Sequence, residues 1–95
     1  MKAYIVSDKN DYDPSVLVFA DTANQAKSIA TGRDELDGIE YVHLSARRAK
    51  YADGYERATE RELMILNIKN GWWYEIGGVH INEENLEDVL TQGIL

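Results

Sequence analysis

The 95-residue sequence contains no cysteine and only one proline. The absence of cysteine excludes disulfide bonds, zinc sites built from thiolates and cysteine nucleophiles. With a single proline and no low-complexity tract, the chain has no segment typical of a disordered tail or linker. No apolar run approaches the roughly 20 residues of a membrane span, and the first residues turn polar by Ser7, unlike a signal peptide. These absences predict a soluble cytoplasmic protein.

Recognisable catalytic and metal-binding motifs are also missing. No serine lies in a Gly-x-Ser-x-Gly context, and Gly77-Gly78 lacks both the spacing and the following lysine of a phosphate-binding loop. His43 and His80 each lie between apolar neighbours, without further ligands at a recognisable metal-site spacing. We therefore expect a protein that is not an enzyme and that has no metal site and no cofactor.

What the chain does contain is enough apolar material for one small domain over residues 1–95: 44% of its residues are hydrophobic, with two Trp and six Tyr. Its clearest stretch is Ser15–Gly32. Within it, Val16–Ala20 is an unbroken apolar run, which predicts a central strand covered on both faces. Thr22 and Gln25 then form a capping box, which predicts a helix that stops at Gly32.

The remaining elements follow from hydrophobic periodicity and turn signals. Before the central strand we predict a strand at 3–7 and a polar hairpin loop at 8–14. After the first helix we predict a half-buried strand at 40–47, with Val42, Leu44 and Ala46 on its apolar face, and then a loop at 48–58. The last part of the chain is predicted to form a helix from the capping box Thr59–Glu62 to about Asn70, a hairpin of 72–76 and 79–81 around Gly77-Gly78, and a short acidic helix at 83–90 capped by Asn82. This order predicts an α+β fold: a mainly antiparallel sheet of four to five strands, with two longer helices and a short C-terminal helix packed on it.

The net charge of −7 is unevenly distributed along the chain. Residues 1–46 carry four Lys/Arg and eight Asp/Glu, residues 47–61 carry five against three, and residues 62–95 carry one against six. A basic segment therefore lies between two acidic ones. Wholesale binding to a phosphate backbone is disfavoured, because the uncompensated acids repel a polyanion.

The basic segment alternates cations with aromatic residues. This mixture suits single-stranded nucleic acid or an acidic protein surface, because Arg and Tyr both stack and Arg grips phosphate. The other interpretation is that the cations form local ion pairs with Asp53, Glu56 and Glu60. The candidates for a basic and aromatic binding surface are Arg47, Arg48, Lys50, Tyr51, Tyr55, Arg57, Trp72 and Trp73, with Arg61 at the end of the segment.

The two adjacent tryptophans, Trp72 and Trp73, point to opposite faces if they lie in a strand. We expect one of them in the core. The other is either packed under a helix or exposed as an aromatic anchor of the kind that dominates interfaces.

A second candidate surface is acidic. Spaced carboxylates on a folded protein can imitate a row of phosphates and occupy the nucleic-acid-binding cleft of another protein. Acids at the start of a helix also have a purely structural explanation, because they interact favourably with the helix macrodipole. The acidic candidates for partner binding are Glu83, Glu84, Glu87 and Asp88, with Asp34, Glu35 and Asp37 as further acids.

Short motifs along most of the chain resemble those of small uncharacterised accessory proteins encoded by phages and prophages of Gram-positive bacteria. The motifs that carry this resemblance are Met1–Val6, Val18–Thr22 with Ala26-Lys27, Tyr41–Leu44 leading to Arg47-Arg48, Asp53-Gly54, Thr59–Glu62 and Gly71–Trp73. The resemblance implies an accessory phage gene and transfers no catalytic residue. It also implies binding to a host protein, since small acidic phage proteins often act on host defence systems such as CRISPR nucleases.

The leading hypothesis from the sequence is a non-enzymatic, anti-CRISPR-type inhibitor that binds and blocks a host macromolecule in the bacterial cytoplasm. The expected partner is a host protein, with a nucleic-acid-binding defence effector as the favoured class, nucleic acid as the second choice and no membrane. Two alternatives stay open: a nucleic-acid-binding module that uses residues 47–61, and a protein that sequesters a nucleotide signal by aromatic stacking and Arg–phosphate contacts. The sequence does not indicate an oligomeric state.

Overall fold

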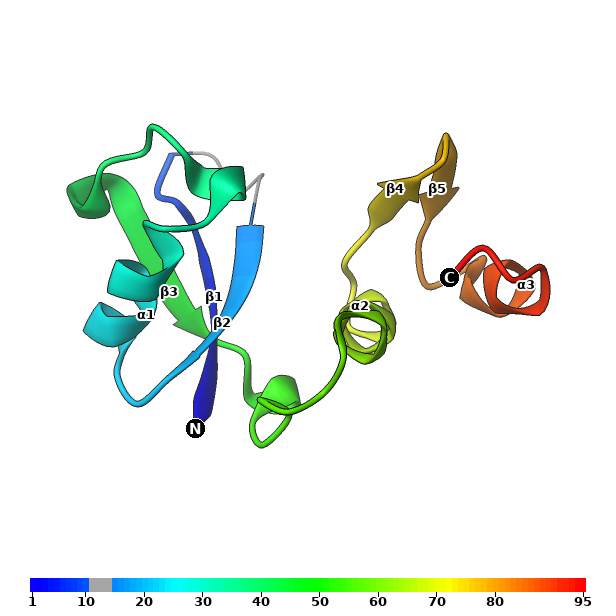
Figure 1. Ribbon diagram of the computed structural model, residues 1–95, viewed down its shortest axis with the longest axis horizontal. Coiled ribbons are helices and arrows are strands. Elements are labelled where there is room, and N and C mark those ends of the chain that lie inside the picture. Colours follow the sequence, from blue (N-terminus) through cyan, green and yellow to red (C-terminus); the bar gives the residue numbers. More distant parts are fainter. Residues whose placement is uncertain (11–14) are drawn as a thin grey trace. The chain divides into compact units, whose positions relative to one another are not determined.

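The computed structural model describes residues 1–10 and 15–95, which form five strands and three α-helices (Figure 1). The elements are β1 (Lys2–Asp8), β2 (Ser15–Ala20), α1 (Ala23–Ala30), β3 (Leu44–Arg48), α2 (Glu60–Lys69), β4 (Tyr74–Ile76), β5 (Val79–Ile81) and α3 (Leu86–Thr91), with short 3-10 helices at Asp34–Leu36, Tyr41–His43 and Lys50–Ala52. The strand pairs in these ranges are antiparallel. The predicted α+β class and the order of strands and helices are confirmed.

The strands form two sheets instead of the predicted single sheet. One sheet has three strands in the order β2-β1-β3, and the other is the β4–β5 hairpin. The chain correspondingly divides into two compact units, Met1–Glu56 and Arg57–Leu95, each with its own apolar core. A single domain over residues 1–95 stays a prediction. Of the predicted hairpin loop, Asp8 ends β1, and residues 11–14 lie outside the described residues.

The first unit is built around β1 and not around β2. Tyr4 of β1 lies opposite Val18 of β2 and opposite Arg48 of β3, so β1 is paired on both sides. β2 is an edge strand, and its predicted central position is wrong. Val16, Val18 and Ala20 are buried, whereas the residues between them are only half-buried. An unbroken apolar run therefore enters the core at every second residue, as in any strand that is fully covered on one face only.

Helix α1 covers one face of this sheet (Figure 1). Ala26 and Ala30 are fully buried in the core because their small side chains let the helix lie close to the strands. The predicted N-cap at Thr22 is confirmed, and the return bond of the capping box reaches Asp21, one residue before the cap. Thr22 Oγ1 accepts the N–H of Gln25 at 3.2 Å, and Gln25 Oε1 accepts the N–H of Asp21 at 3.1 Å.

The strand predicted over residues 40–47 begins later than expected. Residues Tyr41–His43 form a 3-10 helix, and only Leu44–Arg48 is extended. Val42 is 63% exposed, so its predicted place on the apolar face is wrong. The boundary is set by pairing, since Leu44 lies opposite Asp8, the last residue of β1. The loop predicted next contains the 3-10 helix Lys50–Ala52.

Near the start of the second unit, the predicted N-cap at Thr59 is confirmed, and Glu62 contacts the hydroxyl of the cap residue. Thr59 Oγ1 accepts the N–H of Glu62 and donates to Glu62 Oε1, each at 3.1 Å, at the start of α2. The predicted two-residue hairpin is confirmed, with Ile76 opposite Val79. Gly77 and Gly78 have φ angles of +57° and +79°, which this tight turn requires and which residues with a side chain rarely adopt.

The core of the second unit lies between one face of the hairpin and the apolar sides of α2 and α3. Its buried members are Ile68, Ile81, Leu86 and Val89, with Ile65, Tyr74, Ile76, Val79, Leu90, Ile94 and Leu95 packed against them. Because Tyr74 and Ile76 face this core, the residues that alternate with them face away from it.

Replacement of either capping threonine should destabilise the protein. We expect Thr22→Ala and Thr59→Ala each to lower the free energy of unfolding by about 1 kcal/mol, because a helix N–H loses its acceptor. Urea denaturation followed by circular dichroism measures this change. Ser28→Ala, an exposed position inside α1, is the matched control and should change stability by less than about 0.5 kcal/mol. Equal effects of all three substitutions would contradict the capping role.

Candidate functional site

The outer face of the β4–β5 hairpin presents an exposed aromatic and polar cluster. It consists of Trp73, Glu75 and His80, all exposed. Glu75 lies directly opposite His80 in the register. The rings of Trp73 and His80 stack with their centroids 5.1 Å apart and an interplanar angle of 24°. Trp73 is nevertheless 51% exposed, so its indole is oriented by His80 and still accessible to a partner.

Trp72 lies on the other side of the chain, as predicted for adjacent residues, but it is half-buried and not a full core residue. Its ring stacks on that of Tyr74, with centroids 6.2 Å apart. The main-chain carbonyl oxygen of Asn67 in α2 accepts the main-chain N–H of Trp72 at 3.0 Å, and the side-chain Nδ2 of Asn67 donates to Tyr74 Oη at 3.0 Å. The helix thus fixes the chain where it enters β4. Burial raises the pKa of the Tyr74 phenol, and the hydrogen bond from Asn67 lowers it by less.

The turn between β5 and α3 is fastened by two asparagines. Asn82 Oδ1 accepts the N–H groups of Glu84 and Asn85 at 3.0 and 3.2 Å. Asn85 Oδ1 accepts the Asn82 N–H at 2.9 Å, and Asn85 Nδ2 donates to the carbonyl oxygen of His80 at 2.7 Å. The acidic turn is therefore tied directly to the strand that carries His80. Asn82 caps this turn and not the helix, which begins at Leu86 instead of the predicted residue 83.

The four predicted acids of this region are all exposed; they are Glu83, Glu84, Glu87 and Asp88. The first two lie in the turn, and the other two lie in the first turn of α3, where the helix macrodipole favours them. The second unit as a whole carries three Lys/Arg and seven Asp/Glu, a net charge of −4. The exposed indole of Trp73 thus belongs to an acidic unit. A cationic group suits this arrangement, since Trp is the best aromatic partner for a cation and carboxylates supply the opposite charge.

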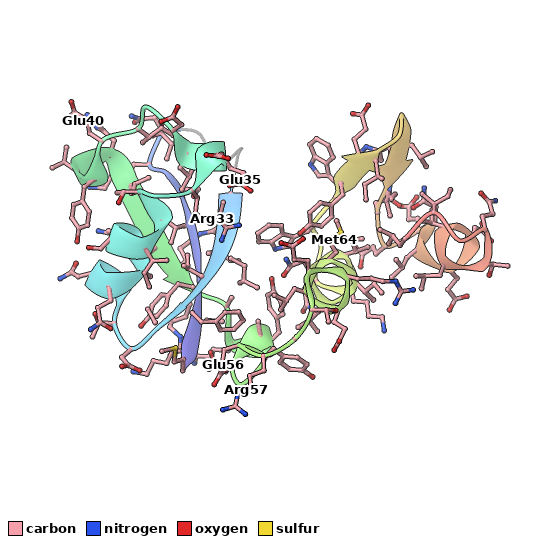
Figure 2. All side chains as sticks on the ribbon, viewed as in Figure 1. Arg33, Glu35, Glu40, Glu56, Arg57 and Met64 are labelled. Atoms are coloured by element: carbon pink, nitrogen blue, oxygen red, sulfur yellow. The ribbon has the colours of Figure 1, made fainter. Side chains whose placement is uncertain are left out.

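The predicted basic and aromatic set is divided between the two units. Arg47, Arg48, Lys50, Tyr51 and Tyr55 belong to the first unit, and Arg57, Arg61, Trp72 and Trp73 belong to the second. The further acids Asp34, Glu35 and Asp37 follow α1 in the first unit. There, Arg33 Nε lies 3.6 Å from Glu35 Oε2 on the surface (Figure 2), an exposed pair worth less than about 1 kcal/mol.

Arg48 has a structural role within the first unit. Its guanidinium forms an ion pair with Asp53 and lies over the ring of Tyr4, 5.6 Å from the centroid. Asp53 Oδ1 also accepts the N–H of Ala3 at 2.7 Å, and Ala3 is fully buried. At Arg48, therefore, the interpretation as a local ion pair with Asp53 is confirmed. Glu56, labelled in Figure 2, accepts from the Met1 ammonium at 3.2 Å.

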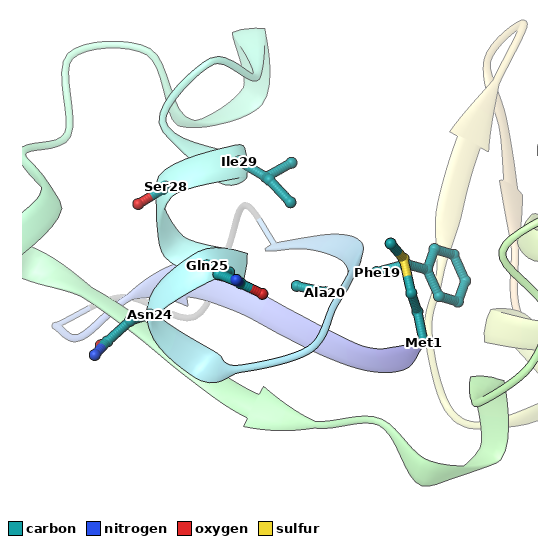
Figure 3. A pocket seen from close by; sticks show the side chains of 7 residues that line it. All are labelled: Met1, Phe19, Ala20, Asn24, Gln25, Ser28 and Ile29. Atoms are coloured by element: carbon teal, nitrogen blue, oxygen red, sulfur yellow. The ribbon is translucent and has the colours of Figure 1, made fainter.

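A groove of about 370 Å³ lies beside β2 and α1 (Figure 3). It is lined by Met1, Phe19, Ala20, Asn24, Gln25, Ser28 and Ile29, none of which has an ionisable side chain. Two of its polar groups already have partners: Gln25 Oε1 accepts the Asp21 N–H, and Asn24 Oδ1 accepts the Tyr41 hydroxyl at 3.3 Å. The groove is thus an apolar surface feature.

Comparison of the chain with protein-family models, with curated proteins and with solved structures gives no match in any of the three. Over residues 1–10 and 15–95, no helix has the length and apolar character that crossing a membrane requires. The same ranges contain no group of three or more His, Asp or Glu placed to hold a metal ion. What the site can do must follow from its own geometry.

Of this cluster, only Trp73 is a binding candidate predicted from the sequence, and Glu75 and His80 are not. A signal for them exists in the sequence. A two-residue turn at Gly77-Gly78 sets the register of the hairpin, and strand alternation then places Trp73, Glu75 and His80 on one face.

The contact of Asp53 with Ala3 should contribute more to stability than its ion pair with Arg48. Asp53→Ala leaves the buried Ala3 N–H without this acceptor, so we expect a loss of about 1–3 kcal/mol in the free energy of unfolding. Asp53→Asn keeps an acceptor oxygen and removes only the exposed charge, so it should cost less than about 1 kcal/mol. Urea denaturation distinguishes the two, and equal losses would contradict this assignment.

The raised pKa of Tyr74 predicts how stability depends on alkaline pH. The folded state holds the phenolic proton more tightly than the unfolded chain, so the free energy of unfolding falls as the pH rises above about 10. Tyr74→Phe should make this fall shallower, and at pH 7 it should cost about 1 kcal/mol through the lost bond with Asn67. Urea denaturation between about pH 7 and 11 tests both effects, with Tyr55→Phe as an exposed control. An unchanged slope in Tyr74→Phe would disprove the role of Tyr74.

Proposed function

We propose that this protein is a non-enzymatic, phage-type binding protein that docks its second unit onto a cationic surface of a host protein and blocks it. A nucleic-acid-binding defence effector, such as a CRISPR nuclease, is the class of partner that this chemistry favours. The observation that carries the proposal is the exposed Trp73, stacked on His80 in a unit of net charge −4.

An oriented tryptophan is a suitable anchor for binding. The stack on His80 and the closed hairpin restrict the indole before any partner arrives, so little conformational freedom is lost on binding. Tryptophan and arginine are enriched among the residues that dominate interface energies, and an arginine can stack on an indole face. An arginine of the partner that stacks on Trp73 would also find the carboxylate of Glu75 on the same face of the hairpin.

The acidic turn and α3 support the same class of partner. Glu83, Glu84, Glu87 and Asp88 are exposed, and the turn is fastened to β5 through Asn85. Carboxylates held in this way resemble the charge of a nucleic-acid backbone and are complementary to a surface built to bind phosphates. A protein that covers such a surface competes with nucleic acid for it. The resemblance to phage accessory proteins agrees with an inhibitor of this type.

The proposal predicts that binding depends on Trp73 and on the four acids. Titration with a hexa-arginine peptide, followed by NMR or by tryptophan fluorescence, should perturb Trp73, and a hexa-glutamate peptide should not. We expect Trp73→Ala to weaken binding about tenfold or more, corresponding to roughly 1.4 kcal/mol or more. Changing the four acids to Gln or Asn should weaken it further and reduce its dependence on salt.

The matched control is Tyr55→Ala, which removes an aromatic side chain of similar exposure (47%) from the first unit. It should bind the peptide like the wild type, and circular dichroism should show all variants folded. With a host lysate as the source of partner, the wild type should capture a nucleic-acid-binding protein and inhibit it stoichiometrically, and the Trp73→Ala variant should not. If Trp73→Ala and the variant with all four acids neutralised both bind and inhibit unchanged, the proposed surface is wrong.

A further inference from the structure

The edge strand β2 lacks the features that normally protect the edge of a sheet. It reads Ser-Val-Leu-Val-Phe-Ala, with no charged residue and no proline. Its register against β1 runs without interruption from Ala20 to Ser15, so no bulge bends it away. The other edge strand, β3, carries Arg47 and Arg48. Proteins usually blunt an exposed edge with charge, proline or a bulge, because its backbone groups can otherwise pair with another strand.

The direction of the backbone groups in β1 follows from the contacts of Ala3. Its N–H donates to Asp53 Oδ1 at 2.7 Å, and its carbonyl oxygen accepts the N–H of Ala49 at 2.9 Å. Ala49 directly follows β3, so both groups of Ala3 point to the β3 side. Successive residues of a strand alternate in this direction, and Tyr4 therefore directs its N–H and C=O toward β2.

This alternation extends to the free edge of β2. Tyr4 lies opposite Val18, so Val18 exchanges its backbone hydrogen bonds with β1. The neighbours Leu17 and Phe19 then direct their N–H and C=O groups away from β1. In the described part of the chain, no strand pairs with this side of β2.

We infer that β2 pairs antiparallel with β2 of a second copy of this chain, across a two-fold axis at Leu17. Leu17 then exchanges both backbone hydrogen bonds with Leu17 of the second copy, and the two three-stranded sheets become one sheet of six strands. In this register Val18 lies opposite Val16 of the second copy, and residues opposite each other point to the same face of the sheet. The sheet faces that α1 covers in the two copies therefore form one continuous face. The strand is thus complementary to itself in both hydrogen bonding and side-chain orientation.

Charge and the apolar groove favour a second copy as the occupant of this edge. Two chains of net charge −7 repel each other, but the uncharged β2 places no like charges opposite each other at the axis. Pairing of β3 with β3 of a second copy would instead bring the arginines of the two strands, Arg47 and Arg48, close together. Beside the β2 edge, Met1 and Ile29 are 63% and 48% exposed and line the groove together with Phe19 (Figure 3). A second copy along β2 would cover this apolar surface.

Cross-linking tests this pairing directly, because the natural chain has no cysteine. In the proposed register, the Cα atoms of the two Leu17 residues lie roughly 5.5 Å apart, within the range of disulfides. Under mild oxidation, the Leu17→Cys variant should therefore form a disulfide-linked dimer, which runs at twice the mass of the single chain on a non-reducing gel. Val42→Cys, an exposed position outside the sheet, is the control and should link on the order of tenfold more slowly, since its thiols are not held together.

A second variant tests the dimer without cross-linking. Leu17→Lys places two ammonium groups opposite each other at the axis, so light scattering should give the mass of one chain, 10.8 kDa, instead of two. Leu17→Thr is uncharged and favours a strand, and it should stay dimeric. A wild-type monomer at every concentration, or a dimer that survives Leu17→Lys, would overturn the inference. Slow hydrogen exchange of the Leu17 and Phe19 amides in a monomer would also overturn it, in favour of pairing with another strand or peptide.

Discussion

The hydrogen bonding of β1 on both sides is the constraint on which the first unit depends. With β2 on one side and β3 on the other, β1 decides which residues of each neighbour enter the core. It also decides where β3 can begin, since pairing ends at Asp8. The contact of the Ala3 N–H with Asp53 belongs to the same constraint, because Asp53 in turn holds Arg48. The guanidinium of Arg48 thus has a structural partner within the first unit.

The second unit depends on a more local constraint, the two-residue turn at Gly77-Gly78. This turn sets the register that places Glu75 opposite His80 and brings Trp73 onto the His80 ring. The turn that follows β5 is tied back to the same strand through Asn85. Aromatic and acidic groups are therefore held on short, closed backbone segments, where they lose little freedom when a partner binds. Low conformational freedom is what the proposed binding to a partner requires.

The accuracy of prediction from the sequence differs between the elements for physical reasons. Both threonine N-caps and the glycine turn involve residues at most three positions apart, so their geometry is encoded locally. The apolar run at Val16–Ala20 is different, because a run of this kind occurs both in buried central strands and in edge strands covered on one face. The strand order β2-β1-β3 shows that this run belongs to an edge strand. The partner and register of a strand cannot be read from a single segment of sequence. The stack of Trp73 on His80 depends likewise on pairing across the hairpin.

The sequence by itself determined the α+β class, the order of strands and helices, the starts of α1 and α2 and the exposed acids of the C-terminal region, because each depends on short-range periodicity, capping or charge. Only the tertiary structure decided that Ser15–Ala20 is an edge strand, that the strands form two sheets, that Arg48 is held by Asp53 and that Trp73 is the exposed tryptophan. These features depend on which distant residues become neighbours. That choice is made by strand pairing and packing across the whole unit, where many weak contacts act together.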